Sequence, residues 1–215
     1  ACEWQINSGN QNFVTMTLPS SPEKSESESS FNFTGVIDRV DALLIDYEFD
    51  DNATILPLDI DLNENLPTSQ LVIIRDIKSL DGPRDNGKDL RHMKGLFEEL
   101  QLALYARSWE ITNPGHRVVG VGVTQVGIET QSWVEIDPDF IDLVEEKSIG
   151  NTTQYLVNQY RRPGEGFQPK SNPFRAWMRE RISTANRVIE MAKSGQVPCN
   201  CSTIDSCRCL DRRGW

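Results

Sequence analysis

The chain has 215 residues and a net charge of −10, with 38% hydrophobic and 25% charged residues. This length and composition predict one globular domain, or two small ones, whose core forms without disulfide staples. No apolar run approaches the ~18 residues that a membrane-spanning helix needs, so the sequence excludes such a helix and predicts no membrane partner. The charge is uneven, because residues 151–215 hold 11 Lys and Arg against 5 Asp and Glu. We expect this basic part to hold a polyanion although the whole chain is acidic.

Hydrophobic patterning predicts several strands in the first eighty residues. Residues 11–18 alternate apolar and polar side chains, and residues 31–46 are the next strand region. Residues 71–79 begin with four consecutive apolar residues, which is typical of a buried strand. Between these strands, residues 19–30 are a polar, low-complexity loop, and residues 47–70 are an acidic segment that we expect to form an exposed hairpin insertion.

In the second half of the chain, helical periodicity and turn residues predict three helices and a β-hairpin. Apolar residues recur at helical spacing in two segments, and in the second of them Asn172 can cap the first turn. The predicted elements are a helix over residues 89–109, a β-hairpin over residues 117–136, a short helix over residues 138–147 and a long helix over residues 172–194.

This order of strands, helix, hairpin and helix predicts an α/β fold in which helices flank a mixed central β-sheet. We expect residues 1–30 to form an N-terminal strand and a loop. Residues 31–195 are the core, with the acidic insertion at 47–70. Residues 196–215 are a cysteine cluster with a basic tail.

Three charged residues lie inside the predicted apolar strands. Asp38 follows an apolar pair in one strand, and Asp76 and Lys78 interrupt the other. Because they are two residues apart, Asp76 and Lys78 point to one face of their strand, about 6.5–7 Å apart. Two carboxylates can hold Mg²⁺, and a lysine beside them can orient or help deprotonate the water that attacks a phosphodiester. The alternative for these three charges is an ion-pair cluster on the surface.

Gln101 and Tyr105 share one face of the predicted helix, since they are four residues apart and about 6 Å from each other. Packing of an apolar helix does not by itself require a glutamine. We expect both side chains to face the Asp38–Asp76–Lys78 centre. There the amide can bind a phosphate or a ligand carboxylate, and the phenol can stack on a base or donate to a phosphate.

Three segments, GVIDRVD, IRDIKS and ELQLALYA, occur in this order along the chain. They resemble the RecB-like nucleases of the PD-(D/E)xK superfamily, and most closely the C-terminal nuclease domain of AddB-type helicase–nucleases. The resemblance covers roughly residues 31–210 and implies a core like that of the restriction endonucleases. It also implies roles for six residues. Asp38 and Asp76 are metal ligands, Ile77 adds a carbonyl ligand, Lys78 is catalytic, and Gln101 and Tyr105 form the Q-x-x-x-Y motif that helps to hold the DNA strand.

The function implied by this resemblance is Mg- or Mn-dependent hydrolysis of single-stranded or unwound DNA by an exonuclease-like enzyme in the cytoplasm. Its partner would be a helicase, within a helicase–nuclease, repair or defence system. A CRISPR-associated spacer-acquisition nuclease of the same fold is a second possibility. A third is a catalytically inactive DNA-binding or scaffold subunit.

The chain departs from the family in two ways, of which the second, a missing upstream ligand, favours the inactive alternative. The interval between Asp38 and Asp76 is longer than is usual in the family. The family also has an upstream helix that supplies a His or Glu as a further ligand, whereas His92 and His116 both follow Lys78.

The five cysteines are Cys2, near the start of the chain, and Cys199, Cys201, Cys207 and Cys209, near its end. In a reduced compartment, such a cluster of thiolates indicates a metal site, and zinc fits four of them. Some RecB-like nucleases carry a four-iron–four-sulfur cluster held by one cysteine before the nuclease motifs and three after them. The resemblance therefore implies Cys2, Cys199, Cys201 and Cys207 as cluster ligands, with Cys209 as a substitute. Zinc and free or disulfide-bonded thiols are the alternatives.

Overall fold

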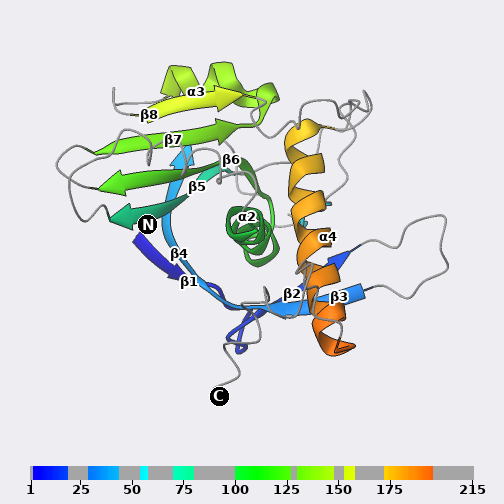
Figure 1. Ribbon diagram of the computed structural model, residues 1–215. Coiled ribbons are helices and arrows are strands. Elements are labelled where there is room, and N and C mark those ends of the chain that lie inside the picture. The colour runs from blue at the N-terminus through cyan, green and yellow to red at the C-terminus, as the bar shows by residue number, and fades with distance from the viewer. Residues whose placement is uncertain are drawn as a thin grey trace, which may run out of the picture.

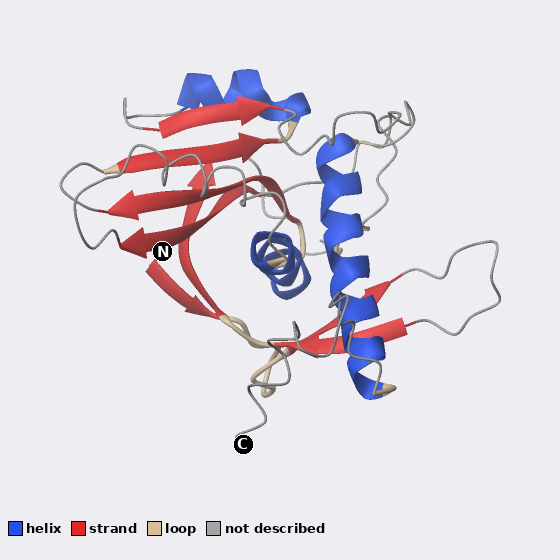
Figure 2. Ribbon diagram, in the orientation of Figure 1, coloured by secondary structure: helices blue, strands red, loops and turns tan. Residues whose placement is uncertain are grey.

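The computed structural model describes residues 2–18, 29–43, 54–57, 70–79, 100–126, 130–147, 153–157 and 172–195 of the chain. The strands among these residues are β1 (Cys2–Gln5), β2 (Val14–Leu18), β3 (Ser29–Phe33), β4 (Val36–Leu43), β5 (Gln70–Ser79), β6 (His116–Val126), β7 (Gln131–Ile136) and β8 (Thr153–Val157). The helices are α2 (Gln101–Thr112), a short 3-10 turn η1 (Pro138–Phe140), α3 (Ile141–Lys147) and α4 (Pro173–Lys193). Figure 1 shows their arrangement, and Figure 2 separates helices from strands by colour.

Six strands form the main sheet, in the order β1-β4-β5-β6-β7-β8, while β2 and β3 pair in a small sheet of their own. The β5–β6 and β7–β8 pairs are parallel, and the other neighbours in the main sheet are antiparallel. The predicted mixed sheet with flanking helices is therefore confirmed. No helix in the described ranges is long and apolar enough to cross a membrane.

Helix α2 lies in the concave side of the curved sheet, between β4 and α4 (Figure 1). Val72 and Ile74 of β5 pack into the same core as α2 and α4, whereas the alternate residues Leu71 and Ile73 pack into a second core with Val144 of α3. Strand β5 is thus buried on both faces, which explains its unbroken apolar run. This double burial fixes which side of β5 faces α2.

Several predicted elements are confirmed. Helix α4 occupies nearly all of the predicted segment, and the side chain of Asn172 accepts a hydrogen bond from the Arg175 backbone N–H at 3.0 Å. The predicted hairpin corresponds to β6 and β7, and the predicted short helix to η1 and α3. Strand β2 falls within the first predicted strand. Of the helix predicted over residues 89–109, the described part is α2, and residues 80–99 lie outside the described ranges.

The strand region predicted over residues 31–46 is divided in the structure between two strands. β3 ends at Phe33, β4 begins at Val36, and the two strands belong to different sheets. The chain passes between them at Gly35, where a Cβ atom would lie 3.0 Å from Cε1 of Tyr105. A side chain at this point would press on the tyrosine ring, so the close approach of β4 to α2 favours glycine.

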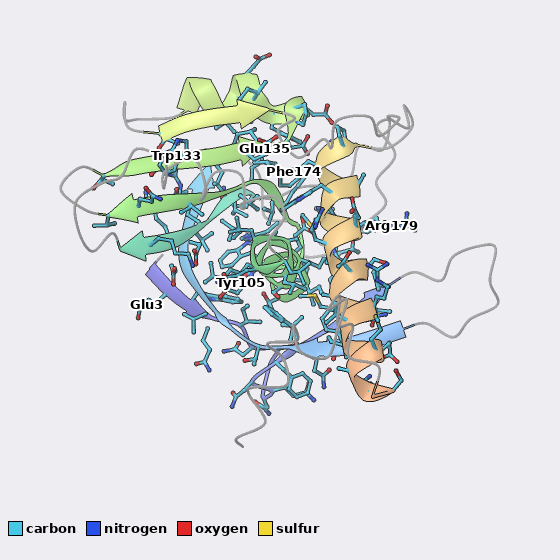
Figure 3. The ribbon with its side chains drawn as sticks, viewed as in Figure 1. Glu3, Tyr105, Trp133, Glu135, Phe174 and Arg179 are labelled. Atoms are coloured by element: carbon cyan, nitrogen blue, oxygen red, sulfur yellow. The ribbon has the colours of Figure 1, made fainter. Side chains whose placement is uncertain are left out.

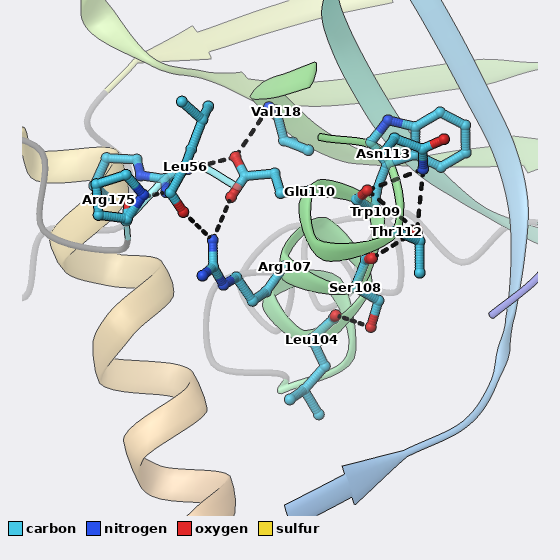
Figure 4. Close-up of polar contacts among 11 residues, drawn as sticks. Leu56, Leu104, Arg107, Ser108, Trp109, Glu110, Thr112, Asn113, Val118 and Arg175 are labelled. Carbon is cyan, nitrogen blue, oxygen red and sulfur yellow. Dashed lines mark hydrogen bonds and ion pairs between the residues drawn. The ribbon is translucent and has the colours of Figure 1, made fainter. Parts of the chain in front are cut away.

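The acidic segment at residues 47–70 is not wholly exposed, contrary to expectation. Leu56 is only 2% exposed, and its carbonyl accepts a hydrogen bond from Arg107 of α2. The carbonyl of Pro57 accepts another from Arg175 of α4 at 2.7 Å. Figure 4 shows Leu56 above this pair of arginines. Residues 54–57 are therefore anchored to both helices, and the rest of the segment lies outside the described residues.

Candidate active site

Asp76 and Lys78 occupy the side of β5 that faces α2, the same side as Val72 and Ile74, because strand residues alternate between faces. The Nζ atom of Lys78 lies 2.7 Å from Oδ2 of Asp76. Asp76 is 5% exposed, whereas 39% of the Lys78 side chain is exposed. The predicted pair is therefore an ion pair with a buried anion and an accessible cation.

Asp38 reaches this pair because strand β4 separates from β5 at that residue. The β4–β5 ladder runs from Leu43 and Leu71 to Arg39 and Arg75. At the next position, Oδ2 of Asp38 accepts a hydrogen bond from the backbone N–H of Ile77 at 2.8 Å. The carboxylate thus takes the place of a backbone acceptor. It is held beside the segment that carries the other two predicted catalytic residues.

The charges of Asp38 and Lys78 both affect the pKa of Asp76. Burial raises the pKa of Asp76 above its ordinary value of 3.8, the neighbouring Asp38 raises it further, and the charge of Lys78 opposes both effects. A divalent cation between the carboxylates would relieve their repulsion, and oxygen donors suit Mg²⁺ or Mn²⁺. Within the described ranges, no group of three or more His, Cys, Asp or Glu side chains is arranged to hold a metal. The donors available to such a cation here would be the two carboxylates and the predicted Ile77 carbonyl, and Mg²⁺ commonly completes its shell with water and substrate oxygens.

Helix α2 supplies the two residues predicted for DNA binding. The amide nitrogen of Gln101 donates to Oδ1 of Asp76 at 3.3 Å and to the hydroxyl of Tyr105 at 2.9 Å. The predicted placement of both side chains towards the acidic centre is confirmed by these contacts, while their role in DNA binding stays a prediction. A chain of contacts therefore runs from Tyr105 through Gln101 and Asp76 to Lys78.

Tyr105 presents its hydroxyl, rather than its ring, to the site. The residue is 8% exposed, and its ring lies 6.0 Å from that of Phe33, centroid to centroid. Figure 3 shows it between α2 and the curve of β4. A ring with so little exposed surface does not agree with the expected stacking on a base. The Tyr105 hydroxyl, which accepts from Gln101, connects this residue to Asp76.

The predicted cluster ligands are only partly within the described ranges. Cys2 begins β1, where its backbone pairs with Arg39 of β4. Strand β1 therefore borders the strand that carries Asp38. The other cysteines, Cys199, Cys201, Cys207 and Cys209, lie outside the described residues.

The missing upstream ligand has no evident replacement among the described residues. His116 pairs with Gln70 at the far end of β5, six residues from Asp76, or about 20 Å along the strand. His92 lies outside the described ranges. Of the glutamates that precede Asp38, Glu3 is exposed on the edge strand β1 with φ 54° (Figure 3), and the others lie outside the described residues.

The strand register reveals one residue that the sequence reasoning missed. Gln125 of β6 pairs with Lys78 of β5, and its side chain is fully buried. The only signal in the sequence is a polar residue near the end of an apolar strand. Its proximity to Lys78 depends on the pairing of strands that are far apart in sequence, which no local pattern contains.

In comparisons with known proteins, no protein-family model, no curated protein and no solved structure matches the chain. A function is therefore proposed from the motifs and from the geometry of the site itself.

Proposed function

We propose that the chain is a metal-dependent deoxyribonuclease with a RecB-like PD-(D/E)xK core, which hydrolyses single-stranded or unwound DNA in the cytoplasm. The observation that carries this proposal is the convergence of Asp38, Asp76 and Lys78 from two neighbouring strands. An acid pair beside a lysine is the arrangement that metal-assisted phosphodiester hydrolysis needs. The contact of Gln101 with Asp76 supports it further, because this helix carries the next family motif in the chain.

Each residue has a defined role in this proposal. Asp38 and Asp76, with the Ile77 carbonyl, hold Mg²⁺ or Mn²⁺, which when bound activates a water and neutralises phosphate charge. The exposed ammonium of Lys78 orients the attacking water and stabilises negative charge on the phosphate. Gln101, itself bonded to Tyr105, fixes the orientation of the Asp76 carboxylate, as partners of metal ligands commonly do.

The long interval between Asp38 and Asp76 is compatible with this activity. Strand β4 ends at Leu43 and β5 begins at Gln70, so the intervening segment leaves and rejoins the sheet at the end away from Asp76. Lengthening a loop costs little, about 0.6 kcal/mol for each doubling. The insertion therefore leaves the distances among the three site residues unaffected.

A catalytically inactive DNA-binding or scaffold subunit of the same fold is the second candidate. It is favoured by one observation, the lack of a third acidic or histidine ligand near the pair in the described ranges. End-labelled single-stranded DNA, incubated with Mg²⁺, Mn²⁺ or EDTA, separates the candidates. A nuclease cleaves it only with a metal ion, whereas an inactive subunit binds it and leaves it intact. A CRISPR-associated spacer-acquisition nuclease would use the same residues and would cleave as well.

The resemblance also supports a four-iron–four-sulfur cluster on Cys2, Cys199, Cys201 and Cys207, with Cys209 as a substitute and zinc as the alternative metal. Such a cluster would attach the C-terminal cysteines to the edge strand beside β4. Iron and zinc analysis of anaerobically purified protein, together with its visible absorption spectrum, distinguishes the two metals. Loss of the metal in Cys207→Ser is expected for either one. A helicase subunit or domain is the proposed partner.

A further inference from the structure

Gln125 extends the row of site residues from β5 onto β6. The parallel register pairs Lys78 with Gln125 and Asp76 with Val123. Side chains of paired residues in neighbouring strands lie on the same face of a sheet. That face is the one towards α2, because Val121 and Val123 pack in the core that contains α2. Gln125 therefore lies beside Lys78 on the side of the sheet that holds the candidate site.

The amide of Gln125 is buried without a hydrogen bond. Its exposed fraction is 0%, and neither Oε1 nor Nε2 has a partner in the described part of the chain. The preceding residue, Thr124, faces the opposite side and pairs its hydroxyl with Ser132 at 2.9 Å. A buried amide without partners costs free energy, because it loses its bonds to water on folding. The Gln125 amide therefore has unused hydrogen-bonding capacity beside the candidate site.

We propose that Gln125 is a phosphate-binding residue that bridges Lys78 and a phosphodiester group of the bound DNA strand; this inference rests on the proposed nuclease function. The ammonium of Lys78 has only donors, and phosphate oxygens are only acceptors. A glutamine amide offers both, so Oε1 accepts from Nζ of Lys78 while Nε2 donates to a phosphate oxygen. One bound phosphate thereby gives partners to both amide atoms.

In this proposal, a phosphate reaches the buried amide of Gln125 by way of Lys78. In the free protein its ammonium is held by Asp76 at 2.7 Å, with 39% of the side chain exposed. A phosphate that approaches this exposed cation arrives at the register neighbour of Lys78, which is Gln125. In this proposal the lysine side chain rotates from the carboxylate towards the phosphate, and Nζ then donates to Oε1 of its register neighbour.

Two substitutions remove the donor of the amide, one with the acceptor and one without it. Gln125→Met has a similar length and no donor or acceptor. Gln125→Glu keeps an acceptor for Lys78 but lacks the donor and adds a charge that repels phosphate. We expect both variants to bind single-stranded DNA about ten- to a hundredfold more weakly, as for a lost hydrogen bond to a charged group. Because the methionine variant removes an unsatisfied buried group, its melting temperature should equal or exceed that of the parent.

The test measures fluorescence anisotropy with a labelled single-stranded oligonucleotide in EDTA, the KM for cleavage with Mg²⁺, and thermal melting. Thr124→Val is the matched control on the other face of β6. It should lower the melting temperature by leaving Ser132 without its partner, yet keep the DNA affinity of the parent. A purely structural role for Gln125 would give the reverse, a loss of stability with unchanged affinity and KM.

Weaker DNA binding or a raised KM in Gln125→Met, at undiminished stability, supports the proposal. Parent-like affinity and KM overturn it, and so does a lower melting temperature, since that would reveal a bond of the amide in the free protein. If the parent cleaves DNA and the Gln125 variants match it, only this inference fails. If the parent neither binds nor cleaves DNA, the proposed function and this inference fail together.

Discussion

The amide of Gln101 donates to Oδ1 of Asp76 at 3.3 Å, while Lys78 holds the other carboxylate oxygen, Oδ2, at 2.7 Å. Both oxygens of this buried carboxylate are therefore engaged, one by helix α2 and one by its own strand. The arrangement fixes the rotamer of Asp76 and presents the exposed Lys78 ammonium beside it. Fixed geometry of this kind is what a catalytic site requires of its residues.

Replacing Tyr105 by phenylalanine tests the contact chain from α2 to Asp76. The variant keeps the ring that packs near Phe33 and removes only the hydroxyl that accepts from Gln101. We expect little loss of stability and slower DNA cleavage, because Gln101 becomes free to rotate away from Asp76. In contrast, Tyr105→Ala should cost about 3–5 kcal/mol of stability through the cavity it creates. Cleavage by Tyr105→Phe at the parent rate would contradict the role of the hydroxyl.

Glu110 joins helices α2 and α4 and is predicted to be a major contributor to stability. Its fully buried carboxylate accepts hydrogen bonds from Arg175, from Arg107 at 3.2 Å and from the backbone N–H of Val118 at 3.1 Å (Figure 4). Glu110→Gln would leave two guanidinium groups without their counter-charge. Urea unfolding should show a loss of about 3–5 kcal/mol, as for broken buried ion pairs.

The control for this prediction is an exposed pair on α4. Glu190 and Lys193 form a contact of 2.9 Å, with more than half of each side chain exposed. Glu190→Gln should change the free energy of unfolding by less than about 1 kcal/mol. Equal losses of unfolding free energy in Glu110→Gln and Glu190→Gln would contradict the prediction that the buried contacts of Glu110 stabilise the fold more than an exposed ion pair.

His116 is expected to make stability depend on pH. Burial lowers the pKa of this imidazole below its ordinary value of 6.5, and Nδ1 accepts a hydrogen bond from the indole of Trp109 at 3.3 Å. Below pH 6.5 the unfolded chain therefore takes up the proton before the folded protein does. The stability of the parent, relative to His116→Gln, should fall as the pH drops from 6.5 through the lowered folded-state pKa. Denaturant unfolding across this range checks the trend, and a constant difference between the two proteins would refute it.

Local patterns predicted most of the elements, and the exceptions have physical causes. Strand β5 was found because burial on both faces produces an apolar run, and α4 because one face repeats at helical spacing. β1 and β8 were missed, since strands of 4 and 5 residues at the sheet edges carry too little pattern to read. The boundary between β3 and β4 was missed because it depends on the contact of Gly35 with Tyr105.

Local patterns likewise predict some of the contacts in the candidate site and not others. Asp76 and Lys78 could be placed on one face from the two-residue period of a strand, and Gln101 and Tyr105 from the four-residue spacing of a helix. The contact of Asp38 with the Ile77 backbone and the pairing of Lys78 with Gln125 could not be predicted. Both depend on where one strand stops pairing or how it is aligned with its neighbour, and a single sequence does not contain that register.

The proposed metal-dependent cleavage of DNA by Asp76 and Lys78 is best tested by comparing their alanine variants with the parent. The substrate is end-labelled single-stranded DNA with Mg²⁺ or Mn²⁺. The controls are Asp142→Ala and Lys193→Ala, which remove exposed charges on α3 and α4. Thermal melting verifies that every variant is folded. We expect cleavage by the parent and both controls, and a loss of at least about a hundredfold in Asp76→Ala and in Lys78→Ala. Near-parental cleavage by either folded variant, or no cleavage by the parent with either metal, would contradict it.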